Sequence, residues 1–225
     1  MKNLYKNGQN FVRNKGIIKT VAQIIVFVPV FAFVVFAQEV DIKKEMKNLD
    51  DKNSQVRVEA TKKLVKSTDS VVVDKVIEHI KKEQQPYIKK QMIQVLALNN
   101  SKKVVETLVE FLDDPNPQVR KTAAVNLGYF NLTEKEISKI SDVLEKENSD
   151  SVKLSLVNTL GIQKSTTTIK VLEKSLEKKN NSKIRVAAVK NLAKINSKEA
   201  KDILKKYAND EDEEVKAEIK KLQKR

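Results

Sequence analysis

Six cations recur at one position of a repeating pattern, and their spacing is the feature that most suggests a binding site. Each directly follows Val or Ile, at intervals of roughly 32 residues: Arg57, Lys89, Arg120, Lys153, Arg185 and Lys216. A regular row of cations could contact successive phosphates of a nucleic acid. Five residues before the Val or Ile, an acid stands in five of the six cases: Asp51, Glu83, Asp114, Glu147 and Asp210, with Lys179 as the exception. We therefore predict a structural ladder of ion pairs and caps between adjacent units.

Other residue types that carry chemistry are scarce. The chain has no cysteine, and His79 is its one histidine. A single histidine without cysteine or a matched acid builds neither a zinc site nor a Ser-His triad. Neither a GxGxxG nor a GxxxxGK[ST] loop is present, so nucleotide binding by those routes is absent. We predict a protein that is not an enzyme, with no catalytic residue, no cofactor, no metal and no small-molecule substrate.

A second charged column, which we call the ridge, has a spacing of 32 residues. It consists of Glu78, Glu110, Asp142, Lys174 and Lys206. In a helix, these positions lie about 200° from the apolar column, and therefore on the exposed face. Three acids followed by two cations would fit a protein of complementary polarity better than a uniform polyanion. Our hypothesis is that the ridge orients a bound partner, and the alternative is chance placement in a highly charged chain.

Apolar residues recur with the same period and predict pairs of helices. Counting from the Val or Ile as zero, positions 0, 4 and 8 are apolar in nearly every repeat, which defines one face of a first helix. After a short loop, a second stripe begins at Val76, Leu108, Ile140, Leu172 and Leu204. A constant period of this length indicates units that bury their apolar faces against their neighbours. The fold class is therefore all-α: an α-solenoid of about five and a half helical hairpins of roughly 32 residues.

Helix ends agree with this pattern. Pro86 and Pro117 fall in the first turns of two first helices, where proline sacrifices no intrahelical donor. We expect Gly128 and Gly161 to end first helices in the left-handed conformation. Glu136 lies three residues after a threonine and predicts a capping box. Second helices are predicted to start at Ser70, Ser101, Thr133 and Ser197.

These residues resemble the HEAT repeat, in the short bacterial form also found in phycobilin lyases. The likeness is clearest in Asp114-Pro115-Asn116-Pro117-Gln118-Val119-Arg120, Ala123-Ala124 and Leu127-Gly128. It covers roughly residues 40–225 and implies a structural role for the cation column. Repeats two and four lack the arginine and have Met92 or Leu156 where alanine is usual, which predicts looser or more curved packing there. Residues 40–50 are expected to form a lone second helix that caps the N-terminal end, within a solenoid domain spanning 38–225.

The N-terminus has the features of a secretory signal peptide, residues 1–37. Residues 1–20 carry five cations and no acid, and residues 21–37 are apolar apart from Gln23. Small or slender residues, Val35 and Ala37, fit signal-peptidase cleavage after Ala37. The alternative is an uncleaved anchor formed by residues 21–37, although this run is short beside the about 20 residues of a typical span. Both readings place the repeats outside the cytoplasm.

Export, fold and the scarcity of catalytic chemistry together predict a non-catalytic protein-binding scaffold. We expect it to be exported, in the periplasm or associated with the cell envelope, and to hold a protein partner there. One alternative is nucleic-acid binding, which export opposes. Another is docking on an anionic membrane surface, because the net charge of the whole chain is +14 and that beyond residue 37 remains positive. A lyase-like enzyme is a third, for which no polar pocket is recognisable in the sequence.

Overall fold

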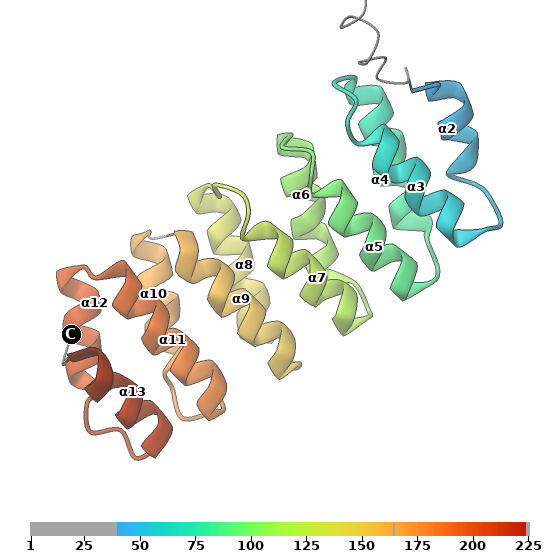
Figure 1. Ribbon diagram of the computed structural model, residues 1–225. Helices are drawn as coiled ribbons and strands as arrows, with labels where there is room; N and C mark the ends of the chain where they lie inside the picture. Colours follow the sequence, from blue (N-terminus) through green and yellow to red (C-terminus); the bar gives the residue numbers. More distant parts are fainter. Residues whose placement is uncertain (1–39, 164, 224–225) are drawn as a thin grey trace, which may run out of the picture. The chain divides into compact units, whose positions relative to one another are not determined.

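The computed structural model describes residues 40–163 and 165–223, and this part is helical throughout, without strands (Figure 1). The predicted signal peptide or anchor, residues 1–37, lies outside the described residues. The helices, in chain order, are α2 (Ile42–Asn48), α3 (Ser54–Leu64), α4 (Ser70–Lys82), α5 (Pro86–Leu96), α6 (Lys102–Glu110) with the 3-10 turn η1 (Phe111–Asp113), α7 (Pro117–Leu127), α8 (Glu134–Lys146), α9 (Asp150–Gln163), α10 (Thr166–Ser175), α11 (Ser182–Ile195), α12 (Lys198–Lys206) and α13 (Glu213–Gln223).

From residue 42 onward the helices form two alternating series (Figure 1). The first helices α3, α5, α7, α9, α11 and α13 each pack against the next in the series. The second helices α6, α8, α10 and α12 also contact the next in line, less extensively, and each packs against a first helix. Five hairpins with a lone second helix (α2) before them and a lone first helix (α13) after them confirm the predicted all-α solenoid.

The predicted apolar columns form the core. At position 8 of the first helices every leucine is fully buried: Leu64, Leu96, Leu127, Leu160 and Leu192. The second-helix column is also buried: Val76, Leu108, Ile140, Leu172 and Leu204. Met92 and Leu156, where the repeat pattern favours alanine, are both buried as well. Each repeat therefore stabilises its neighbours by burying apolar surface, at about 25 cal/mol per Å².

The predicted helix starts are also confirmed. Pro86 and Pro117 occupy the first position of α5 and α7. Ser101 and Ser197 are the N-cap residues of α6 and α12, and α4 begins at Ser70. The capping box at the start of α8 has both of its hydrogen bonds: the Thr133 hydroxyl accepts from the Glu136 N–H, and the Glu136 carboxylate accepts from the Thr133 N–H. These local signals set the hairpin register.

The prediction for the two glycines was wrong. Gly128 follows α7 with φ −65°, in the right-handed region, and α9 continues through Gly161 to Gln163. A Cβ atom at position 161 would lie 2.3 Å from Cγ of Asn191 on α11. Gly161 is therefore required by the close approach of two first helices, and not by a left-handed helix end. Among the described residues, Asn196, at the end of α11, is the non-glycine residue with a left-handed φ, of 57°.

Candidate functional site

Four cations of the ladder are paired with the acid that precedes the next first helix. We call each pair a rung. The rungs are Arg57–Glu83, Lys89–Asp114, Arg120–Glu147 and Arg185–Asp210. All eight side chains are less than one fifth exposed. Each rung therefore joins two adjacent repeats through a largely dehydrated ion pair.

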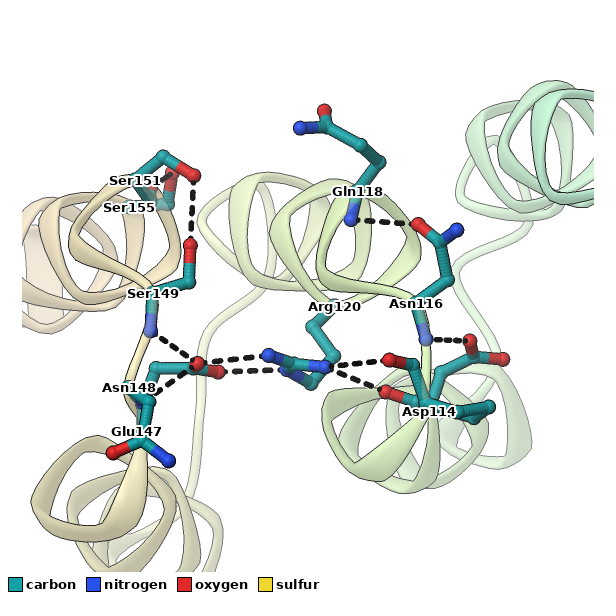
Figure 2. Close-up of polar contacts among 10 residues, drawn as sticks. Asp114, Asn116, Gln118, Arg120, Glu147, Asn148, Ser149, Ser151 and Ser155 are labelled. Carbon is teal, nitrogen blue, oxygen red and sulfur yellow. Dashed lines mark hydrogen bonds and ion pairs between the residues drawn. The ribbon is translucent and has the colours of Figure 1, made fainter.

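The third rung shows how the pair is held (Figure 2). Arg120 on α7 donates from Nε and Nη2 to the two carboxylate oxygens of Glu147, at 2.7 and 2.8 Å. Its Nη1 donates to the carbonyls of Asp114 and Pro115, at 2.9 and 3.1 Å. The hydrogen bond from Arg120 holds the pKa of Glu147 below its usual value. A planar guanidinium thus binds a carboxylate of the following repeat and the loop of its own repeat at once.

The acid of each rung has a second task, which is to cap the turn that leads into the next helix. The Glu147 carboxylate accepts from the Ser149 N–H at 2.7 Å. The equivalent bond joins each acid to the N–H two residues later: Glu83 to Gln85, Asp114 to Asn116 and Asp210 to Asp212, each at 2.9 Å. An acid at this position is therefore needed twice, once by the cation and once by the backbone.

Two cations of the ladder lack such a partner. Lys216 on α13 pairs with Glu213 of its own helix. Lys153 on α9 has no ion pair with any residue that the structure describes, because its expected partner position holds Lys179. The fourth rung is therefore empty.

The ridge lies on the second helices, and most of its charges are already engaged. Glu78 pairs with Lys75 and Lys82 of its own helix, and their hydrogen bonds lower the pKa of Glu78 to about 2. Glu110 on α6 pairs with Lys81 on α4. These pairs use partners within the same helix and on the neighbouring one.

The C-terminal half of the ridge behaves in the same way. Lys174 on α10 lies 2.6 Å from Glu145 on α8, and Lys206 on α12 lies 2.8 Å from Glu173 on α10. Asp142 is exposed and forms no ion pair with the described part of the chain. The ridge thus links adjacent second helices, with Asp142 as its unpaired member. The sequence pattern did not reveal the partner acids because they stand in other columns.

A groove opens on this face between α6–η1 and α8. Its volume is about 580 Å³. Val109, Leu112 and Val143 form an apolar floor, and the charged residues Glu110, Lys139, Asp142 and Lys146 also line it. The groove runs from the third rung to the ridge, since Arg120 and Glu147 line it too. It combines an apolar surface with charges of both signs, as protein-binding grooves do.

In the part of the chain that the structure describes, no metal-binding cluster accompanies this groove. His79 is half-buried, with Nδ1 2.8 Å from the Lys75 carbonyl and Nε2 3.1 Å from the Asp50 carboxylate. Over residues 40–163 and 165–223, no three His, Cys, Asp or Glu side chains are placed to hold a metal ion. None of the described helices is both long and apolar enough to cross a bilayer. The described surface is therefore one of ion pairs, apolar floor and exposed charge.

Comparison with known proteins identifies the repeats. A family model of HEAT repeats matches residues 73–161 and again 137–223, which together are more than half of the chain. The chain belongs to the HEAT-repeat family. The rungs described above are built by the residues that carried the resemblance in the sequence. No curated protein matches this HEAT-repeat chain in sequence.

Solved structures share its architecture at low sequence identity. The complex of CpcE and CpcF of phycocyanin lyase from Nostoc sp. PCC7120 is similar, with a TM-score of 0.54, 17% identity, and coverage of 80% of this chain and 74% of that chain. An engineered protein has a TM-score of 0.49 at 22% identity, covering 83% and 96% of the two chains. Human deoxyhypusine hydroxylase in complex with glycerol has a TM-score of 0.35 at 14% identity, covering 81% and 83%. At 17% identity the likeness to the CpcE–CpcF complex shows the fold alone.

Proposed function

We propose that this HEAT-repeat protein is an exported, non-catalytic scaffold that binds a protein partner along its second helices. The observation that carries the proposal is the groove between α6–η1 and α8, with its apolar floor and its charged lining of Glu110, Lys139, Asp142 and Lys146. A partner segment could bury an apolar side chain against the partly exposed Val143 and place its charges against the exposed groups around it. Such a contact joins an apolar centre to a polar rim, which is the usual anatomy of a protein interface.

The polarity of the ridge fixes the direction of the partner in this proposal. Acids precede cations along it, so a partner would need basic residues over α4, α6 and α8 and acidic residues over α10 and α12. Asp142 is the strongest anchor, because it is exposed and has no ion pair to give up. Glu110 would have to exchange its contact with Lys81 for one with the partner. The exchange is cheap, because exposed ion pairs contribute only about 0–1 kcal/mol each.

The CpcE–CpcF structure supports this reading by analogy. It is a complex of two different chains and shares the solenoid fold at a TM-score of 0.54. Function does not follow from fold, so the lyase activity named for that complex is not carried over. The absence of any cysteine in this chain also removes thiol chemistry from its repertoire. What the analogy supports is assembly with a second protein.

Export is the second part of the proposal. Its support is the basic segment followed by the apolar run of residues 21–37. We expect the mature chain to begin at Gln38 and to fractionate with the periplasm or envelope. Mass spectrometry of the protein purified from its native cells measures the N-terminus directly. An intact chain in the cytoplasmic fraction would refute export.

The binding face can be tested by reversing charges on it. The variant Glu110→Lys with Asp142→Lys changes two groove residues, and the matched control Glu59→Lys with Glu218→Lys makes the same charge change on first helices. After gentle crosslinking in the envelope, we expect wild type and control to capture the same protein and the groove variant to lose it. Helical content by circular dichroism must be unchanged in all three. Equal capture by the groove variant would remove this face from the proposal.

A further inference from the structure

The empty fourth rung differs from the others in the residue type at the position of the acid. The loop before α11 spans residues 176–181, and the loop before α13, with the same length, spans 207–212. In the latter, Asp210 pairs with Arg185 of the preceding first helix and accepts from the Asp212 N–H at 2.9 Å. The position of Asp210 corresponds to Lys179 in the former loop. The position at which the four formed rungs have a carboxylate therefore holds a cation before α11.

Both groups that such a carboxylate would bind are left without an acceptor. Lys153 is half-buried and has no ion pair with any described residue. The Asn181 N–H, which corresponds to the Asp212 N–H, donates no hydrogen bond within the described residues. Lys179 itself extends to the surface, where its Nζ lies 2.9 Å from the exposed carboxylate of Glu177. Lys153, which is half-buried, and the N–H of the exposed Asn181 are therefore two donors without an acceptor among the described residues.

A small pocket lies at this place. It has a volume of about 50 Å³ and is lined by residues of α8, α9, α10 and α11 and by Lys179 and Asn180 of the loop before α11, next to Asn181 in the chain. Its charged lining consists of Lys153, Lys174, Lys179 and one acid, Glu145, which is already paired with Lys174 at 2.6 Å. The pocket therefore has an excess of positive charge. Its volume suits a few water molecules or a single carboxylate group, and not a metabolite.

We propose that Lys153, Lys179 and the Asn181 N–H form a carboxylate-binding site in which an acidic side chain of the bound partner replaces the missing rung acid. The carboxylate would accept from Lys153 and from the Asn181 N–H, as Asp210 accepts from Arg185 and from the Asp212 N–H. Lys179 would supply a second cation from the loop. The assignment of the occupant to the partner rests on the proposed function, whereas the site itself does not. The pocket includes Lys174 and Ser175 of α10, which is the first second helix over which acidic partner residues are expected.

The site can be tested in solution with acetate as the probe. Two-dimensional NMR of the full mature chain, at constant ionic strength set with chloride, follows the Asn181 amide during the titration. We expect a saturable shift of this amide with half-saturation in the millimolar range, since one partly exposed carboxylate binds weakly. Inorganic phosphate is the second arm. Tighter binding of phosphate than of acetate would overturn the assignment to carboxylates.

Variants distinguish a built site from general charge attraction. Lys179→Asp restores the rung acid, so its Asn181 amide should be insensitive to acetate, and its melting temperature should rise by about 2–4 °C. Lys153→Ala should lose the response through loss of the cation. Lys190→Asp makes the same charge change as Lys179→Asp at an exposed position of α11 and should respond like wild type. An acetate response in Lys179→Asp equal to that of wild type would overturn the site.

The partner assignment has its own readout. Capture of the partner by Lys179→Asp, measured by the crosslinking assay above, should fall at least several-fold, while Lys190→Asp captures normally. If acetate binds as expected but Lys179→Asp captures the partner fully, the assignment of the occupant is overturned and the site stands. If no variant and no wild-type chain captures any protein, the proposed function fails instead.

Discussion

Removing the cation of the third rung gives the sharpest test of how the repeats are joined. Arg120→Met keeps most of the apolar stem but removes four hydrogen bonds, two to Glu147 and two to backbone carbonyls. The side chain of Glu147 is 2% exposed and would remain as a buried charge without a cation. Breaking a buried pair in this way costs about 3–5 kcal/mol. Because Glu147 keeps its bonds to the Ser149 and Asn148 N–H groups, we expect the lower end, about 3 kcal/mol.

Urea unfolding followed by circular dichroism measures this cost. The double variant with Glu147→Gln removes the buried charge as well, so it should be more stable than Arg120→Met alone. Lys81→Ala is the matched control, because it breaks an exposed pair with Glu110 and should cost about 0–1 kcal/mol. The coupling between repeats also falls, so the transition should become broader, as expected when a single interface in a repeat array is weakened. A cost for Arg120→Met no greater than that of Lys81→Ala would refute the reasoning.

Three further predictions concern pH and local packing. Because the pKa of Glu147 is lowered in the folded chain, its rung stabilises fully above the unfolded pKa of about 4.3 and loses this contribution as the pH falls through the folded pKa. The urea midpoint of wild type should therefore fall more than that of Glu147→Gln between about pH 6 and pH 3; parallel curves would contradict this. Gly161→Ala must displace the buried Asn191 and should cost about 1–3 kcal/mol, whereas Gly128→Ala, with a right-handed backbone and more space, should cost less than about 1 kcal/mol by thermal melting. Thr133→Ala loses the capping box of α8 and should cost about 1 kcal/mol in the same assay, and a neutral result would show that the cap is not needed.

The fold was predictable because the buried apolar columns and the acids of the ladder repeat with the same period of about 32 residues. The leucines at position 8, of which Leu127 is one, are buried in each repeat, and the prolines and the Thr133 box set the helix starts. Each repeat contacts mainly its neighbours in the chain, so the residues that determine its structure lie close together in the sequence. A single sequence is therefore enough to predict the fold. The acid five residues before Val119, Asp114, recurs with the same period, and so the exception at Lys179, five residues before Ile184, was visible too.

What the sequence did not reveal depends on contacts between helices. Gly161 has the local signature of a helix end, but α9 continues through it, and Asn191 of α11 occupies the space that a side chain at position 161 would need. The ridge was predicted as a free charged surface, yet Glu110 and Lys174 are paired with neighbours on the preceding second helix. Such pairs join columns that are not related by the repeat. The groove beside Asp142 likewise arises from the spacing of α6 and α8, which the period does not give.

The central claim is that the second-helix face, and not the first-helix face, holds a protein partner. A photo-crosslinking amino acid placed at position 142, beside the groove, and in a separate variant at position 59, on α3, compares the two faces in living cells. Both positions are exposed, so neither substitution should disturb the fold. The account predicts one defined crosslinked protein from position 142 and none from position 59. Equal crosslinking from both positions, or crosslinking from position 59 alone, would contradict it.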